Sequence, residues 1–204
     1  MSFVFVRHGQ TDWNVEHRLQ GVRDTALNER GREQARALGE RWKKEGMTFR
    51  KVYSSPLQRA LDTAEIATGM DRSGFVLDDR LKEMAFGVME GAVYSGSGNT
   101  DISLCMEAFL GRPESFVPQE GGESFPEVLD RALDFLLDLR EKEKDTDGNI
   151  LVVSHGAIMH GLLFHLEGRT DINEFWETPT MNCEPSVWEN LDMIQKRSRT
   201  CSGK

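Results

Sequence analysis

The sequence predicts an α/β fold, a three-layer α/β/α sandwich in which helices cover both faces of a mostly parallel central sheet. Two observations lead to this prediction. Residues 3–6 and 150–153 are short, uninterrupted apolar runs, the pattern of strands that are buried on both faces. Further short strand candidates alternate with segments whose apolar residues recur at helical spacing, an order typical of βα units.

The first strand is predicted at residues 3–6, and a polar tripeptide follows it directly. The first long helix is expected between Asn28, a good N-cap residue, and Gly46, a residue type that often ends helices. Its buried face is predicted from three apolar residues at helical spacing, Ala35, Leu38 and Trp42.

A second strand is predicted at residues 52–54. The next helix is expected to begin at Ser55-Pro56, because serine is a good N-cap and proline suits the first helical position. Gly69 would end this helix, and residues 75–77 form a third strand candidate.

Residues 85–122 differ from the rest of the chain. Seven glycines interrupt this segment, and its periodicity is weak apart from a possible short helix at residues 104–110. The segment is therefore interpreted as an insertion or lid within a single domain that spans residues 1–195. The polar residues 196–204 are expected to form a frayed tail.

The C-terminal half returns to regular alternation. Ser124 and Glu127 fit a capping box before a long amphipathic helix. The apolar run at residues 150–153 predicts a central parallel strand, and the next helix opens at Gly156. Residues 186–191 are expected to form an edge strand.

Composition excludes some classes of function. The chain has 34 acidic and 25 basic residues and a net charge of −9, which gives no support to nucleic-acid or anionic-membrane binding. No apolar run is long enough for a signal segment or a membrane span. Three cysteines without a CxxC pair indicate reduced thiols and a cytoplasmic location rather than a disulfide framework or a zinc site.

Polar residues that could take part in catalysis or binding follow the predicted strands. His8 and His155 each sit in a tripeptide directly after an apolar strand, where ligands of open α/β sheets bind. Arg7 and Arg59 add permanently charged guanidinium groups that suit phosphate oxygens, and the start of the helix that carries Arg59 would favour an anion. Together these groups predict a phosphate site.

Glu83, just after the third strand candidate, could supply the proton that a leaving alkoxide needs. Each of these residues alone is more commonly a structural or surface residue. Their shared position at strand ends is what favours a site. His160 and His165 lie on the last helix without partners at metal-ligand spacing, and they are interpreted as structural.

At these residues the chain resembles the histidine phosphatase superfamily, the phosphoglycerate-mutase-like proteins. The resemblance covers most of the chain and rests on six blocks in family order. These blocks are Val6-Arg7-His8-Gly9 with Asn14, Leu19-Gln20-Gly21 with Leu27-Asn28-Glu29-Arg30-Gly31, Ser54-Ser55-Pro56-Leu57-Gln58-Arg59-Ala60, Leu81-Lys82-Glu83 with Glu90-Gly91, Gly121-Gly122-Glu123-Ser124, and Val153-Ser154-His155-Gly156.

The resemblance implies a role for each matched residue. His8 would be the nucleophile that forms a phosphohistidine, and Glu83 would be the general acid and then the general base. Arg7, Arg59 and His155 would bind the phosphoryl group and stabilise its charge. The residues implied to contact the substrate are Asn14, Gln20 and Gly21. No metal and no other cofactor is implied.

The resemblance leaves two activities open, a phosphatase for a small phosphorylated metabolite, such as a sugar phosphate, and a 2,3-bisphosphoglycerate-dependent phosphoglycerate mutase. The phosphatase is favoured because Gln20-Gly21 stands where the mutases carry Thr-Gly. The stretch from Ala85 to Glu120 also has a single basic residue, Arg112, although a mutase must hold a carboxylate and a second phosphate. A catalytically silent phosphate-binding module is a third reading, which the complete catalytic set disfavours. The oligomeric state is not predicted.

Overall fold

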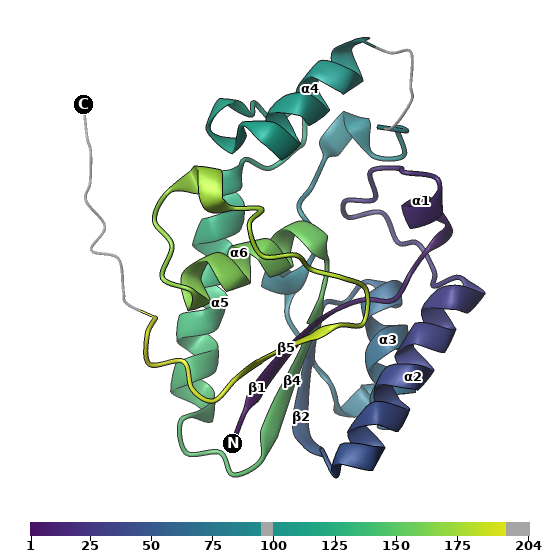
Figure 1. Cartoon of the computed structure of the whole chain (residues 1–204), viewed down its shortest axis with the longest axis vertical. Helices are drawn as coiled ribbons and strands as arrows, with labels where there is room; N and C mark the ends of the chain where they lie inside the picture. The colour runs from purple at the N-terminus through teal and green to yellow at the C-terminus, as the bar shows by residue number, and fades with distance from the viewer. Residues whose placement is uncertain (95–99, 195–204) are drawn as a thin grey trace.

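The computed structural model describes residues 1–94 and 100–194. Five strands form one mixed sheet in the order β3-β2-β4-β1-β5 (Figure 1). Four of them run parallel, namely β1 (Phe3–Arg7), β2 (Phe49–Ser54), β3 (Val76–Leu77) and β4 (Asn149–Ser154). The edge strand β5 (Pro185–Trp188) runs antiparallel to β1. The mostly parallel sheet that the sequence predicts is therefore confirmed.

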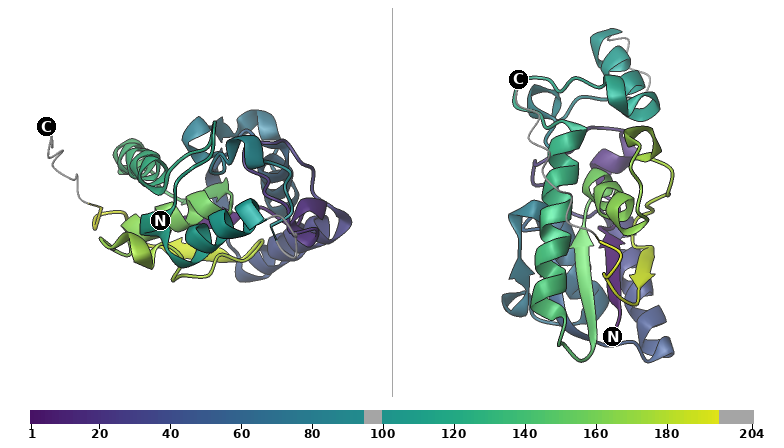
Figure 2. Two further views of the ribbon diagram at one scale, coloured as in Figure 1. Left: turned by 90° about the horizontal axis from the view of Figure 1, so that it is seen from above. Right: turned by 90° about the vertical axis from the view of Figure 1, so that its left-hand side faces the viewer.

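Helices cover both faces of the sheet. One face carries α2 (Glu29–Glu45) and α3 (Gln58–Thr68), and the other carries α5 (Phe125–Glu143) and α6 (Gly156–Leu166), as Figures 1 and 2 show. Alternate strand residues enter two separate cores. Val4 and Val6 pack with the α2 and α3 side, whereas Phe3 and Phe5 pack with the α5 and α6 side. The three-layer α/β/α prediction is confirmed.

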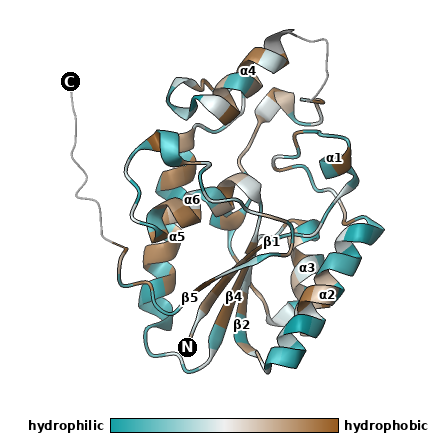
Figure 3. Ribbon diagram, in the orientation of Figure 1, coloured by the Kyte–Doolittle hydropathy of each residue, from teal (hydrophilic) through white to brown (hydrophobic). Residues whose placement is uncertain are grey.

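The central strand β4 explains why its sequence is apolar without alternation. It pairs with β1 on one side and β2 on the other, and helices lie above and below it. Its residues Ile150 to Val153 are at most 1% exposed. Both faces of this strand are thus buried, and in Figure 3 the central strands carry mostly hydrophobic colour whereas α2 is largely hydrophilic.

The predicted start and end of α2 are confirmed, but the predicted start of α3 is wrong. Asn28 caps α2, and Gly46 ends it in the left-handed conformation with φ +67°. Helix α3, however, begins at Gln58 with Leu57 as its N-cap, rather than at Ser55-Pro56. The physical reason is that the Ser55 hydroxyl has other partners. It accepts a hydrogen bond from Leu57 N within the turn before the helix, and it is hydrogen-bonded to His155.

The predicted insertion at residues 85–122 contains α4 (Thr100–Gly111), which is longer than the helix expected at residues 104–110. This helix lies beyond the carboxyl ends of the parallel strands (Figure 1). Residues 95–99 of the insertion and the predicted tail at 196–204 lie outside the described residues. The other short helices are α1 (Asp12–Val15) and the 3₁₀ helices η1 (Arg72–Gly74), η2 (Asp79–Leu81), η3 (Gly87–Met89), η4 (Pro113–Ser115) and η5 (Ile172–Glu174).

The edge strand starts at Pro185, one residue earlier than predicted, and ends at Trp188. Proline has no N–H to donate, so the first residue of an edge strand is a place where it is tolerated. Across the described part of the chain, none of the helices combines the length and the apolar character that crossing a membrane requires.

The start of α5 yields a prediction about stability. Ser124 Oγ accepts a hydrogen bond from Glu127 N, and the Glu127 carboxylate accepts one from Ser124 N at 2.8 Å. Ser124→Ala removes half of this capping box, and we expect the free energy of unfolding to fall by about 1 kcal/mol in urea titrations. Ser115→Ala is the control, since among the described residues this exposed hydroxyl hydrogen-bonds with Glu114 alone, and a loss as large as that of Ser124→Ala would contradict the capping argument.

Candidate active site

The pairing of β1 with β4 brings the two predicted histidines together. Arg7 at the end of β1 lies opposite Ser154 at the end of β4, so the next residue of each strand enters the same site. The imidazole rings of His8 and His155 are tilted against each other with 5.1 Å between their centres. Both side chains are almost completely buried.

The His8 ring has a defined protonation pattern. Its Nδ1 lies 2.6 Å from the Gly9 carbonyl oxygen, which can only accept, so Nδ1 carries the proton. Its Nε2 accepts a hydrogen bond from Arg59 Nε at 3.3 Å. Burial, followed by the charges of Arg59 and Arg7, holds the pKa of His8 well below 6.5. The ring is therefore neutral, with a lone pair on Nε2.

His155 is held by a residue from another strand end. Its Nε2 lies 2.7 Å from Ser55 Oγ, whereas its Nδ1 is buried and has no hydrogen-bond partner among the described residues. Burial and the charge of Arg59 keep the pKa of His155 well below 6.5. One ring nitrogen thus remains unsatisfied by the protein, which is unusual for a buried polar atom.

Arg59 is a fully buried cation. Its Nη1 and Nη2 donate to the carbonyl oxygens of Arg23 and Gly21 at 2.7 and 2.8 Å, and burial lowers its pKa to about 10. The group is still positively charged at neutral pH. Within the described ranges 1–94 and 100–194, no carboxylate forms an ion pair with it.

Arg7 is the second cation of the site. It donates from Nη1 to Thr180 O at 2.9 Å, while its Nε is buried without a partner in the described structure. Burial lowers the pKa of Arg7, and the nearby charge of Glu83 partly opposes this shift. A buried cation without an ion-pair partner is costly. Arg59 is fully buried and Arg7 is half-buried, and two such cations without ion-pair partners among the described residues form a site beside His8 that favours an anion.

Glu83 lies at the N-terminus of α6. Its Oε1 accepts hydrogen bonds from Met84 N and Ala157 N, both at 2.9 Å, and from Ile158 N at 3.3 Å. The other oxygen, Oε2, faces Gly156, because a Cβ placed on that glycine would lie 3.3 Å from Oε2 and 3.5 Å from Arg7 Cζ. The carboxyl group thus presents one free oxygen to the space beside Arg7.

The three residues implied to contact the substrate, Asn14, Gln20 and Gly21, line a pocket together with His8 and Glu83. Asn14 uses its Oδ1 to accept from Thr11 N at 3.0 Å, which caps α1 and leaves its amide NH₂ group unused in the cap. Gln20 accepts from the Thr25 hydroxyl at 2.7 Å. Gly21 has φ +52°, and a side chain there would meet the Glu90 carboxylate, so this turn requires glycine.

The start of α3 does not offer the anion site that the sequence suggested. Gln58 N donates to Asp24 Oδ1 at 2.7 Å, and Leu57 N is bonded to Ser55 Oγ. The N–H groups of Leu57 and Gln58 therefore have protein partners and are not available to an anion. The contribution of this helix to the site is therefore the Arg59 side chain.

The sequence interpretation missed several supporting residues. Asn182 donates to the His8 carbonyl oxygen at 2.6 Å, and Thr63 accepts from Gly9 N at 3.0 Å. The Glu90 carboxylate accepts from Val22 N and Phe86 N. These contacts join residues from 4 to 174 positions apart, so sequence spacing carries little signal for them. For Glu90, its place in the Glu90-Gly91 block could have indicated a role.

The site opens into a pocket of about 200 Å³. Its polar floor includes Arg7, His8, Asn14 and Glu83. Its outer wall is mostly apolar, and the sequence interpretation did not foresee it, since the wall is built from the loop after α1, the insertion, α6 and the segment after η5. The wall residues include Leu19, Phe86, Met106, Phe109, Leu110, His160 and Trp176. His160, which the sequence suggested to be structural, thus also borders the pocket.

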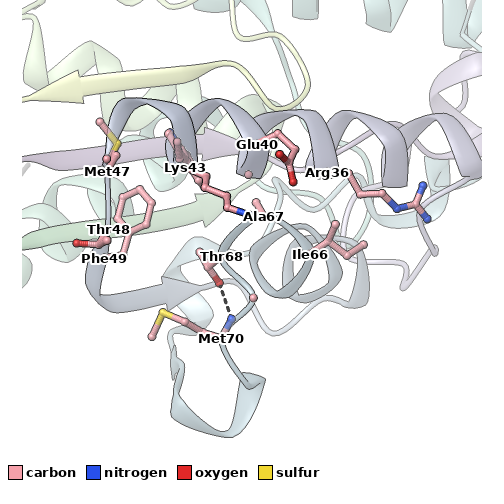
Figure 4. Close-up of a pocket in the computed structure, with 14 residues that line it drawn as sticks. Arg36, Glu40, Lys43, Met47, Thr48, Phe49, Ile66, Ala67, Thr68 and Met70 are labelled. Carbon is pink, nitrogen blue, oxygen red and sulfur yellow. Dashed lines mark hydrogen bonds between the residues drawn. The ribbon is translucent and has the colours of Figure 1, made fainter.

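A larger hollow of about 570 Å³ lies elsewhere, between the C-terminal ends of α2 and α3. Figure 4 shows Met47, Phe49, Ile66 and Met70 around it. It contains no histidine and none of the predicted site residues. The smaller pocket is therefore the candidate active site. No group of three or more potential metal-ligating side chains occurs in the described portion of the chain.

Known proteins resemble this chain in sequence and structure. Phosphoglycerate mutase-like protein 4 from Arabidopsis thaliana is 38% identical over 162 residues, which cover 79% of this chain and 69% of that protein. Phosphoserine phosphatase 1 from Hydrogenobacter thermophilus is 31% identical over 214 residues, with 98% and 93% covered. The solved structure of Bacillus stearothermophilus YhfR matches with a TM-score of 0.77 at 30% identity, over 91% of this chain and 89% of that one.

The family model agrees with the geometry of the site. The model of the histidine phosphatase superfamily (branch 1) matches residues 3–192, a range that includes every candidate site residue described above. The chain therefore belongs to branch 1 of the histidine phosphatase superfamily.

Proposed function

We propose that this protein is a phosphomonoesterase that acts on a small phosphorylated metabolite through a phosphohistidine on His8. One observation carries the proposal. The fully buried Arg59 and the half-buried Arg7 have no ion-pair partners in the described structure, and they lie beside a neutral histidine whose unprotonated Nε2 accepts a hydrogen bond from Arg59. A phosphate group would supply the negative charge that both arginines lack, and its phosphorus would be open to attack by Nε2.

In the first step, His8 Nε2 forms a bond to phosphorus while the bond from phosphorus to the ester oxygen breaks. The Glu83 carboxyl group gives its proton to the leaving oxygen, which departs as an alcohol. Arg7, Arg59 and the unsatisfied Nδ1 of His155 stabilise the charge on the phosphoryl oxygens.

In the second step, the Glu83 carboxylate takes a proton from water. The water oxygen attacks phosphorus and the bond from phosphorus to Nε2 breaks, which restores neutral His8 and protonated Glu83 and releases inorganic phosphate. The backbone N–H groups on Oε1 hold the carboxyl group in place, so that Oε2 performs both proton transfers. No step needs a metal ion, and we expect a chelator to leave the activity unchanged.

The alternative activity is phosphoglycerate mutation, and the similarity to phosphoglycerate mutase-like protein 4 favours it. The charge of the insertion argues against it. Its basic residue Arg112 pairs with Glu107 at 3.3 Å and is absent from the pocket lining, so it is poorly placed to hold a second anionic group.

A panel assay separates these activities. We expect release of free phosphate from small phosphate esters without formation of 2-phosphoglycerate from 3-phosphoglycerate. Rapid isomerisation that depends on 2,3-bisphosphoglycerate would establish the mutase instead. A protein that binds phosphate without turnover of any ester, 4-nitrophenyl phosphate included, would be a silent binding module.

His8→Ala tests the nucleophile. We expect kcat to fall by at least about 10³-fold, because removal of a nucleophile abolishes the covalent route. Acid-labile labelling of the protein by phosphate should disappear as well, while the thermal melting curve stays cooperative. His17→Asn is the matched control at an exposed histidine, and activity of His8→Ala within tenfold of the wild type would refute the assignment.

Glu83→Gln tests the proton donor. The amide oxygen of glutamine can still accept from Met84 N and Ala157 N, so the variant should fold. We expect turnover of alkyl phosphates to fall by about 10²- to 10⁴-fold, and turnover of 4-nitrophenyl phosphate to fall much less, since its leaving group needs no proton. Equal losses on both substrates would show that Glu83 has another role.

The depressed pKa values of His8 and His155 predict a pH response. In ¹⁵N spectra of the free protein, both rings should be neutral at pH 6.5, where an unfolded histidine is half protonated, with His8 protonated on Nδ1. An unfolded histidine takes up a proton near pH 6.5, so the unfolded state binds more protons and the free energy of unfolding should decrease below that pH. Protonation of His8 with a midpoint near 6.5 would contradict the neutral nucleophile.

A further inference from the structure

We infer that the outer part of the pocket binds an apolar group of about one ring, so that the substrate is a phosphate monoester of an aromatic or aliphatic alcohol. This inference rests on the proposed phosphatase function and names its substrate class. It is narrower than the sugar phosphate or similar metabolite that the sequence suggested. The apolar group would fill the part of the pocket that the phosphate does not occupy.

The outer wall is built by elements from both ends of the chain. Leu19 comes from the loop after α1, and Phe86 from the start of the insertion. Helix α4, which lies across the carboxyl end of the sheet in Figure 1, contributes Met106, Phe109 and Leu110. Trp176 closes the wall from the segment after η5. These six side chains are apolar or aromatic.

Two polar atoms of the wall have protein partners, whereas His160 Nδ1 is buried without one among the described residues. The indole Nε1 of Trp176 donates to Phe109 O at 2.7 Å. His160 Nε2 lies 3.0 Å from Thr180 Oγ1, and burial lowers the pKa of His160 to about 3, so the ring is neutral at physiological pH. The hydroxyl groups of a sugar would lose hydrogen bonds to water here, and the six apolar or aromatic side chains offer none in exchange.

The wall also lacks an available charge for a second ionic group. Among the described lining residues, Arg18 is the one cation besides Arg7, and it pairs with the Glu16 carboxylate and donates to Gly91 O at 2.8 Å. The one lining carboxylate is Glu83, which the chemistry requires. A carboxylate or ammonium group on the substrate would therefore be desolvated without an ion-pair partner.

The aromatic wall is held rigidly. The Phe109 ring contacts Phe86, Phe116, Phe125 and Trp176, with ring centres between 4.9 and 5.3 Å apart. A wall that is ordered before the ligand arrives costs little entropy on binding. The pocket volume of about 200 Å³ limits the bound group. This volume includes the phosphate site, so the outer part has room for one small group.

The first test measures binding without chemistry. Calorimetric affinities of the wild-type protein would be compared for benzylphosphonate, ethylphosphonate and 2-carboxyethylphosphonate, which share the anionic group and resist hydrolysis. We expect benzylphosphonate to bind at least about tenfold more tightly than either of the others. Equal affinities, or tighter binding of the carboxylate compound, would overturn the apolar substrate class.

Turnover is measured separately, so that failure of the substrate class is distinguishable from failure of the phosphatase function. Benzyl phosphate, ethyl phosphate and 3-phosphoglycerate place similar demands on Glu83, and we expect the highest kcat/KM for benzyl phosphate by at least about tenfold. Hydrolysis of all three at similar kcat/KM would refute the substrate class and leave the phosphatase intact. Absence of hydrolysis even with 4-nitrophenyl phosphate would refute the phosphatase, while the phosphonate affinities would still decide the pocket's preference.

Leu110→Arg tests the wall directly. Leu110 lines the pocket but is 53% exposed, so an arginine there should not prevent folding. We expect the ratio of benzylphosphonate to 2-carboxyethylphosphonate affinity to fall by about tenfold, because the new cation favours the carboxylate. Leu104→Arg is the matched control, since it is 59% exposed on the same helix and lies outside this pocket. An equal change in both variants would show a general charge effect and contradict the assignment of Leu110.

Discussion

The parallel pairing of β1 with β4 is the interaction on which the rest of this structure depends. It places Arg7 opposite Ser154, so that His8 and His155 leave the sheet side by side although 147 positions separate them. The same two strands are buried on both faces and contribute to both hydrophobic cores. Because a one-residue slip in register would turn every side chain to the opposite face, the cores that stabilise the sheet also determine the geometry of the site.

Burial in turn defines the electrostatics of the site. Arg59 remains charged inside the protein because backbone carbonyl oxygens of the loop at Gly21 and Arg23 accept from it, without neutralising it. Its charge and that of Arg7 help to keep His8 neutral. In the proposed mechanism the two arginines attract a phosphate and keep Nε2 unprotonated, so that its lone pair can attack phosphorus once Arg59 Nε donates to a phosphate oxygen instead.

The two halves of the pocket come from different kinds of structure. The polar floor lies at the ends of β1, β4 and the segment after β3, where a packed sheet holds it. The outer wall comes largely from α4 and from the loop that carries Trp176, which connect to the sheet through loops. This division lets the chemistry of a fold remain constant while its loops determine the substrate. In our proposals, the floor performs phosphate transfer and the wall selects an apolar alcohol.

The sequence by itself determined the order of strands and helices, because apolar runs, helical spacing and caps such as Asn28 and Ser124 are local signals. It also indicated much of the site, since Arg7, His8 and His155 directly follow predicted strands and Glu83 follows the third strand candidate a few residues later. Only the tertiary structure decided that Ser55 bonds His155 rather than starting a helix, that Glu83 rests on the N–H groups of α6, and that Asn182 supports His8. Such contacts depend on the packing of elements far apart in the chain, and the apolar wall of the pocket does so as well, so no local pattern encodes them.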